Sequence, residues 1–87
     1  MTRPRLATGA RLRYDDVREE HVLLVPEGAV RLNRTAAEVL ELCDGERSVD
    51  DIVGALSARY DDAGLGDDVR GLVDAMAKRG LVVDAAA

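Results

Sequence analysis

Few residues of this chain have side chains that could do chemistry. Cys43 and His21 provide only two soft metal ligands, whereas a metal site needs several that converge. Cys43 falls on the apolar stripe of a predicted helix, which indicates a buried core thiol, and His21 begins an apolar strand. A Cys–His nucleophile would require these two side chains to meet beside an oxyanion site, and nothing else in the sequence suggests one.

The acidic pairs are equally weak as catalytic groups. They fall at predicted turns or helix starts, where capping and the helix dipole explain carboxylates, and paired general acids are the alternative. The pairs are Asp15-Asp16, Asp50-Asp51, Asp61-Asp62 and Asp67-Asp68. Gly64-Leu65-Gly66 lacks the preceding strand and the following Lys-Ser/Thr of a phosphate loop. We therefore expect a protein that is not an enzyme and that holds no cofactor or metal.

Length and composition bound the class. The 87 residues make one domain, and the core must be thin because Phe and Trp are missing. Homodimerisation or partner binding could supply further burial, and the sequence does not distinguish them. The net charge of -5 argues against a nucleic-acid partner. The N-terminus has no apolar run of the kind found in signal peptides. The longest purely apolar run of the chain, residues 22–25, is far too short to span a bilayer. We therefore expect a soluble, cytoplasmic protein without a membrane partner.

The first half of the chain has the period of strands. Residues 1–10 are mixed and are expected to form a flexible lead-in. Polar and apolar residues alternate over 11–14, and 21–25 is apolar on both faces, which predicts a central strand. Residues 26–28, Pro-Glu-Gly, are typical of a three-residue hairpin loop before a third strand over 29–32.

From residue 33 onward the period is helical. Asn33 or Thr35 can cap a first helix, with Thr35 and Glu38 as a capping box, and Asp44-Gly45 ends it. Ser48 with Asp51 begins a second helix, and a third begins near Asp67-Asp68 and ends at Gly80. The three apolar stripes are Ala36, Val39, Leu40 and Cys43; Val49, Ile52, Val53 and Leu56; and Val69, Leu72, Val73 and Met76.

Strands grouped before helices predict an α+β fold: a winged helix-turn-helix-like domain with an N-terminal three-stranded antiparallel sheet followed by three helices. The single domain is expected to span residues 11–83, with residues 81–83 either a short closing strand or a packed segment, and 84–87 a frayed tail. This arrangement alone leaves a winged-helix transcriptional regulator as a rival. Its recognition helix, residues 67–79, carries three acidic and three basic side chains, which suits phosphate contact poorly.

Five segments resemble the PqqD family of pyrroloquinoline quinone (PQQ) biosynthesis, and the resemblance covers most of residues 6–83. The segments are RLRYD (11–15), HVLL (21–24), PEG (26–28), LNRTAAE (32–38) and LCDG (42–45). A helix ending in Asp-Gly before a Ser-capped helix recurs across precursor-peptide recognition domains, whereas the PEG turn followed by LNRTAA is more specific to the quinone pathway.

The resemblance implies a peptide chaperone, a RiPP recognition element. It would bind the precursor peptide PqqA by strand addition and present it to PqqE, a radical S-adenosylmethionine (SAM) enzyme that holds any iron-sulfur cluster. A recognition domain of another peptide-modification pathway is the alternative. The implied peptide-binding residues lie on the third strand and third helix: Ala29, Val30, Arg31, Leu32, Val69, Arg70, Val73 and Ala77. Arg70 would hold an acidic leader residue, Val69 and Val73 are alternatively ordinary core, and Gly71 marks either a close backbone approach or a small-residue contact.

Overall fold

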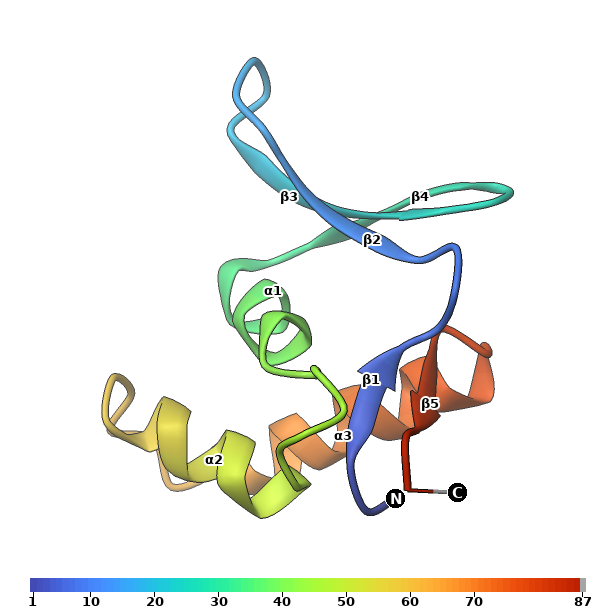
Figure 1. Cartoon of the computed structure of the whole chain (residues 1–87). Helices are drawn as coiled ribbons and strands as arrows, with labels where there is room; N and C mark the ends of the chain where they lie inside the picture. The colour runs from blue at the N-terminus through green and yellow to red at the C-terminus, as the bar shows by residue number, and fades with distance from the viewer. Residues whose placement is uncertain (87) are drawn as a thin grey trace.

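The computed structural model describes residues 1–86. Five strands and three helices follow one another along the chain (Figure 1). In order they are β1 (Pro4–Leu6), β2 (Arg11–Asp15), β3 (Glu20–Val25), β4 (Gly28–Leu32), α1 (Arg34–Glu41), α2 (Val49–Ser57), α3 (Leu65–Lys78) and β5 (Val82–Asp84). The α+β prediction, with three antiparallel strands before three helices, is confirmed.

Strands β2, β3 and β4 form an antiparallel sheet with β3 in the centre, as its apolar sequence predicts. The hairpin between β3 and β4 is tighter than expected. Val25 pairs directly with Gly28, so the turn contains only Pro26 and Glu27 rather than three residues. Gly28 keeps a positive φ of +151°, which a residue with a side chain adopts rarely.

A second, two-stranded sheet joins the ends of the chain. β1 pairs antiparallel with β5, with Arg5 opposite Val83, so residues 4–6 differ from the loose lead-in expected from the sequence. The Asp84 carboxylate accepts hydrogen bonds from the backbone N–H groups of Thr2 and Arg3, at 2.8 and 3.0 Å. Residues 84–86 are therefore tied into this sheet where a frayed tail was expected, and Ala87 lies outside the described residues.

The helix starts follow capping chemistry. Asn33 caps α1 by accepting a 2.8 Å hydrogen bond from the N–H of Ala36, so the predicted capping box at Thr35 is wrong. The box of Ser48 and Asp51 at α2 is confirmed in both directions, each bond at 3.0 Å. α3 begins at Leu65, earlier than predicted, because Leu65 is buried in the core.

The helix ends are also set locally. Gly80 stops α3 with a φ of +74° and donates its N–H to the carbonyl of Ala77, as predicted. α1 ends at Glu41, before the expected Asp44-Gly45, and Gly45 instead donates a 2.9 Å hydrogen bond to the carbonyl of Pro4. The α1–α2 connection is thereby attached to β1.

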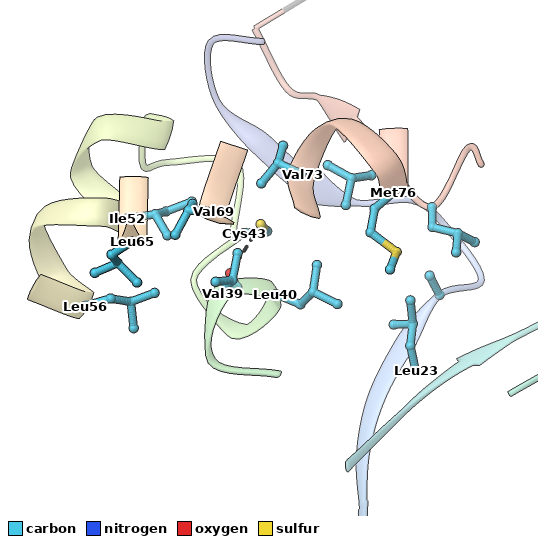
Figure 2. Packing of buried hydrophobic residues seen from close by; sticks show 13 residues of the cluster. Leu23, Val39, Leu40, Cys43, Ile52, Leu56, Leu65, Val69, Val73 and Met76 are labelled. Atoms are coloured by element: carbon cyan, nitrogen blue, oxygen red, sulfur yellow. Dashed lines mark hydrogen bonds between the residues drawn. The ribbon is translucent and has the colours of Figure 1, made fainter. Parts of the chain in front are cut away.

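The core is largely aliphatic; it lies among the three helices and reaches the three-stranded sheet at Leu23 (Figure 2). Leu23 enters it from β3 and is completely buried, α1, α2 and α3 supply most of the remainder, and Ala10, Cys43, Leu81 and Val82 complete it. The buried helical side chains are Ala37, Val39, Leu40, Ile52, Leu56, Leu65, Val69, Val73 and Met76. On α1 the buried alanine is Ala37 rather than the predicted Ala36. All three helices lie on one side of the three-stranded sheet (Figure 1), so no helix or strand within residues 1–86 covers its other face.

Candidate functional site: the free edge of β4

β4 is paired on one side only, and the register shows which of its backbone groups face outward. Val25 and Gly28 flank a two-residue turn, so they exchange both hydrogen bonds of a narrow pair. Hydrogen-bonded and non-hydrogen-bonded pairs alternate along antiparallel strands. Val30 and Leu32 therefore bond to β3 as well. The N–H and C=O groups of Ala29 and Arg31 point away from β3, to the free edge.

This edge is open within the described residues. No backbone hydrogen bond from Ala29 or Arg31 to an element other than the sheet occurs in residues 1–86. The side chains of both residues are exposed, whereas Val30 and Leu32 on the opposite face are partly buried against the core. Residues 29–32 contain no proline, so every one of them has a backbone N–H that could join a ladder, but the pairing with β3 leaves only alternate residues free.

A small apolar hollow lies at the end of β4. Its volume is about 190 Å³, and it is bounded by the start of α1 and the first half of α3. The lining side chains are Asn33, Thr35, Ala36, Val39, Asp68, Val69 and Leu72. Asn33, which directly follows the last residue of β4, places this hollow beside the end of the strand.

The structure brings Val69 to this hollow but separates the other predicted α3 residues from it. Val69 and Val73 are each 1% exposed, which is the ordinary core role that the sequence left open. Val73 lines a different hollow, of about 440 Å³, between α3, the start of α2 and the N-terminus. Of the predicted α3 residues within the described chain, Val69 alone combines a core position with a place beside the end of β4.

Arg70 and Ala77 lie on the flank of α3 that faces away from this hollow. Positions 70, 74 and 77 share one side of a helix with 3.6 residues per turn, whereas 68 and 72 share the other. Arg70 forms an ion pair with Asp50 of α2 and donates a 3.3 Å hydrogen bond to the carbonyl of Gly66. Its guanidinium is therefore bonded to other residues of the domain, and the side chain lines the larger hollow.

Leu72 is the α3 residue that the sequence did not single out for binding. It belongs to the predicted apolar stripe, yet it is only partly buried and lines the hollow with Val69. Its position at the margin of the stripe, on the side of Asp68, was the available signal. The spacing of apolar residues could not show which margin of the stripe lies beside β4, because this depends on how α3 packs against the other elements.

Cys43 and His21, the two residues with soft metal-binding side chains, pack against other residues of the domain. Cys43 is buried, its thiol donates a 3.3 Å hydrogen bond to the carbonyl of Val39, and burial raises its pKa to about 11, so the thiolate is disfavoured. The ring of His21 lies against Tyr14, with centroids 4.9 Å apart. Residues 1–86 contain no group of three or more side chains placed to hold a metal ion. None of the described helices is long and apolar enough to cross a bilayer.

Three of the eight residues in the acidic pairs, Asp15, Asp51 and Asp62, accept local backbone hydrogen bonds. Asp15 accepts hydrogen bonds from the N–H groups of Val17 and Arg18 in the β2–β3 turn. Asp62 accepts a bond from the N–H of Gly64 before α3, and Asp51 completes the capping box of α2. These partners agree with the capping and turn roles predicted for the pairs.

Two solved structures share this fold. The PqqD truncation of Methylobacterium extorquens PqqCD, described as a functional and stand-alone recognition element for ribosomally synthesised and post-translationally modified peptides, matches with a TM-score of 0.78 and 38% identity, covering 92% of this chain and 87% of the other. Lasso peptide synthetase B1, complexed with its leader peptide, matches in fold with a TM-score of 0.76 at 24% identity, covering 93% and 98% of the two chains. The domain has the fold of a RiPP recognition element.

Sequence comparison identifies the family within this class. The family described as coenzyme PQQ synthesis protein D (PqqD) matches residues 20–82. A PqqA binding protein of Rhodopseudomonas palustris strain TIE-1 is 40% identical over 86 residues, covering 97% of this chain and 84% of its own. One of Methylococcus capsulatus is 38% identical over 72 residues, covering 83% and 77%. The chain belongs to the PqqD family, as the resemblance of its motifs predicts.

Proposed function

We propose that this protein binds the precursor peptide PqqA by adding it as a strand to β4 and presents it to the radical SAM enzyme PqqE. The observation that carries the proposal is the free edge of β4. Two residues there, Ala29 and Arg31, hold unpaired backbone donors and acceptors at the spacing that a second strand requires. The names of the relatives, PqqA binding proteins, support the choice of peptide.

The hollow between α1 and α3 would give the added strand its specificity. Backbone pairing alone reads no sequence, whereas alternate side chains of an added strand can enter pockets. Leu72, which is only partly buried, offers an apolar surface there above the buried Val69, and Asp68 and Asn33 add polar groups at its rim. An apolar peptide side chain at the end of the paired segment fits this lining.

The role is recognition without catalysis. Holding the peptide as a strand raises its local concentration beside the enzyme and lowers the entropy lost when the enzyme engages it. The proposed location of this step is the cytoplasm. Arg70, Val73 and Ala77 are not needed for the proposed contact, since they lie in the core or on the far flank of α3.

Calorimetric titration with synthetic PqqA peptide tests the proposal, with a scrambled peptide of the same composition as the control. We expect saturable binding of the native sequence only. Amide spectra of the titrated protein should show the largest changes at Ala29 and Arg31. Binding of both peptides alike, or changes confined to α2, would contradict the strand-addition proposal.

A further inference from the structure

The outer face of the three-stranded sheet combines apolar and cationic side chains. Leu23 points into the core, so its neighbours Val22 and Leu24 point to the opposite face. The register places Arg13 and Arg31 on either side of Val22. Arg11 and Ala29 flank Leu24 in the same way. The result is an apolar strip along β3 with arginines on both neighbouring strands.

This face is hollowed. It encloses a volume of about 590 Å³ whose wall is completed by the β2–β3 turn. Val17 at the tip of that turn is 92% exposed and lines the same hollow. No helix covers this side of the sheet in Figure 1, so Val22 and Leu24 are shielded only by the side chains around them. An apolar strip with an exposed apolar rim is typical of an interaction surface.

The four arginines of this face outnumber its three carboxylates, Asp15, Asp16 and Glu20, although the molecule as a whole is acidic. The whole chain carries -5, yet Arg11, Arg13, Arg18 and Arg31 gather here. Two of these arginines form surface ion pairs. The Nε atom of Arg31 lies 3.7 Å from Oε2 of Glu20, and that of Arg18 lies 4.0 Å from Oδ2 of Asp15. Arg11 and Arg13 form no ion pair with any residue from 1 to 86, so their charges are available to a partner.

We infer that this face docks a protein surface whose apolar side chains are framed by carboxylates, and that the partner is the enzyme that modifies the bound peptide. The inference rests on the proposed function. Ala29 and Arg31 belong to both surfaces: their backbones face the free edge and their side chains face outward. A strand added to β4 would extend the row of Arg13, Val22 and Arg31 by one peptide residue. The enzyme would thus contact carrier and peptide across one continuous sheet face.

Nucleic acid is the weaker occupant. Asp15, Asp16 and Glu20 lie among the arginines, and a phosphate backbone would meet these carboxylates on an acidic protein. The apolar strip at Val22 and Leu24 would also gain nothing from phosphates. A protein surface uses both parts of the face.

Binding of the radical SAM enzyme by surface-immobilised protein tests the inference. We expect Arg13→Glu to weaken enzyme binding by about tenfold and to reduce its dependence on salt. Val22→Thr, which preserves shape and strand propensity, should weaken it by about threefold. Lys78→Glu makes the same charge change on α3 and should leave the affinity within about twofold of the wild type.

Peptide affinity is measured in parallel on each variant, with circular dichroism to check folding. Enzyme binding that falls in Arg13→Glu while peptide affinity stays constant supports the inference. Unchanged enzyme binding in Arg13→Glu and Val22→Thr overturns the inference. Folded variants that lose affinity for the peptide and for the enzyme equally also overturn it. Capture of a DNA duplex that Arg13→Glu abolishes would assign the face to nucleic acid instead. A wild type that binds the enzyme but not the peptide contradicts the proposed function alone.

Discussion

Arg70 and Asp50 form an ion pair that joins α3 to the first turn of α2. Arg70 lies on the side of α3 that faces away from the hollow at the end of β4, where Leu72 lies. Arg70 and Leu72 are only two positions apart in the sequence, yet they face different parts of the molecule. Their substitution therefore distinguishes the two flanks of α3.

We expect Arg70→Glu to leave peptide affinity within about twofold of the wild type and to cost at most about 1 kcal/mol of unfolding free energy, because both partners are largely exposed. Leu72→Gln, in which the new side chain is similar in size and helix propensity, should lower the affinity for the peptide by about fivefold because apolar contact area is removed. Calorimetry and urea unfolding measure the two effects. The opposite ranking would place the peptide on the Arg70 side.

Proline substitution tests the register of β4. In Arg31→Pro the lost N–H faces the free edge, so the strand should keep its pairing with β3 while peptide affinity falls by about tenfold. Arg31→Ala removes the same side chain but keeps the N–H, and should bind the peptide nearly as the wild type does. Similar peptide affinities for the two variants would mean that the peptide does not pair with Arg31.

Val30→Pro has a different expected outcome. The N–H of Val30 belongs to the β3–β4 ladder, so its loss should lower the unfolding free energy by about 1–3 kcal/mol. Thermal unfolding followed by circular dichroism measures this loss. If Val30→Pro were as stable as Arg31→Pro, the alternation derived from the hairpin would be incorrect.

Gly71 in α3 has no structural need for glycine. It is exposed, and an added Cβ would meet nothing within 4 Å, so a close backbone approach within the domain does not explain it. Gly71→Ala should raise the unfolding free energy by about 0.5–1 kcal/mol through helix propensity, without changing peptide affinity. Gly54→Ala, equally unobstructed, is the matched control. A loss of binding in Gly71→Ala alone would show that the peptide backbone reaches this position.

Acid should loosen the junction of the chain ends. Backbone N–H groups of Thr2, Arg3 and Ala86 lower the pKa of Asp84 from 3.8 to about 2. Because the folded-state pKa lies below the unfolded value, the stabilisation is complete above the unfolded pKa and is lost as pH falls from 3.8 towards about 2.

Asp84→Asn should therefore lower the melting temperature near neutral pH and reduce its decrease between about pH 5 and about pH 2.5. Thermal scans at several pH values provide the measurement. Parallel pH profiles for Asp84→Asn and the wild type would attribute the acid sensitivity to other carboxylates, such as Glu38 and Asp44, whose pKa values are also lowered.

Local chemistry explains which parts of the fold could be predicted. The Ser48–Asp51 box and the stop at Gly80 depend on residues within one turn, so the sequence alone located them. The β1–β5 pairing joins segments at opposite ends of the chain. Three residues beginning with Pro4 show no measurable alternation, so this pairing could not be predicted.

The same distinction applies to the candidate site. The edge strand was predictable because β4 follows a hairpin and precedes the helices. Which α3 residues accompany it was not predictable, since this depends on how the buried face of α3, with Val69 and Val73, packs against α1 and α2. The sequence likewise predicted a start of the third helix near Asp67-Asp68, whereas burial of Leu65 extends the helix to that residue.

The pairing of β1 with β5 also determines how the domain can be linked to something else. Ala85 donates a 2.8 Å hydrogen bond to the carbonyl of Arg3, so the two ends of the described chain leave the molecule side by side. They do so on the side of the helices away from the three-stranded sheet (Figure 1). A tag, a surface tether or a fused domain at either end would therefore extend away from β4. A short linker between the ends would permit circular permutation with new termini in the β2–β3 turn.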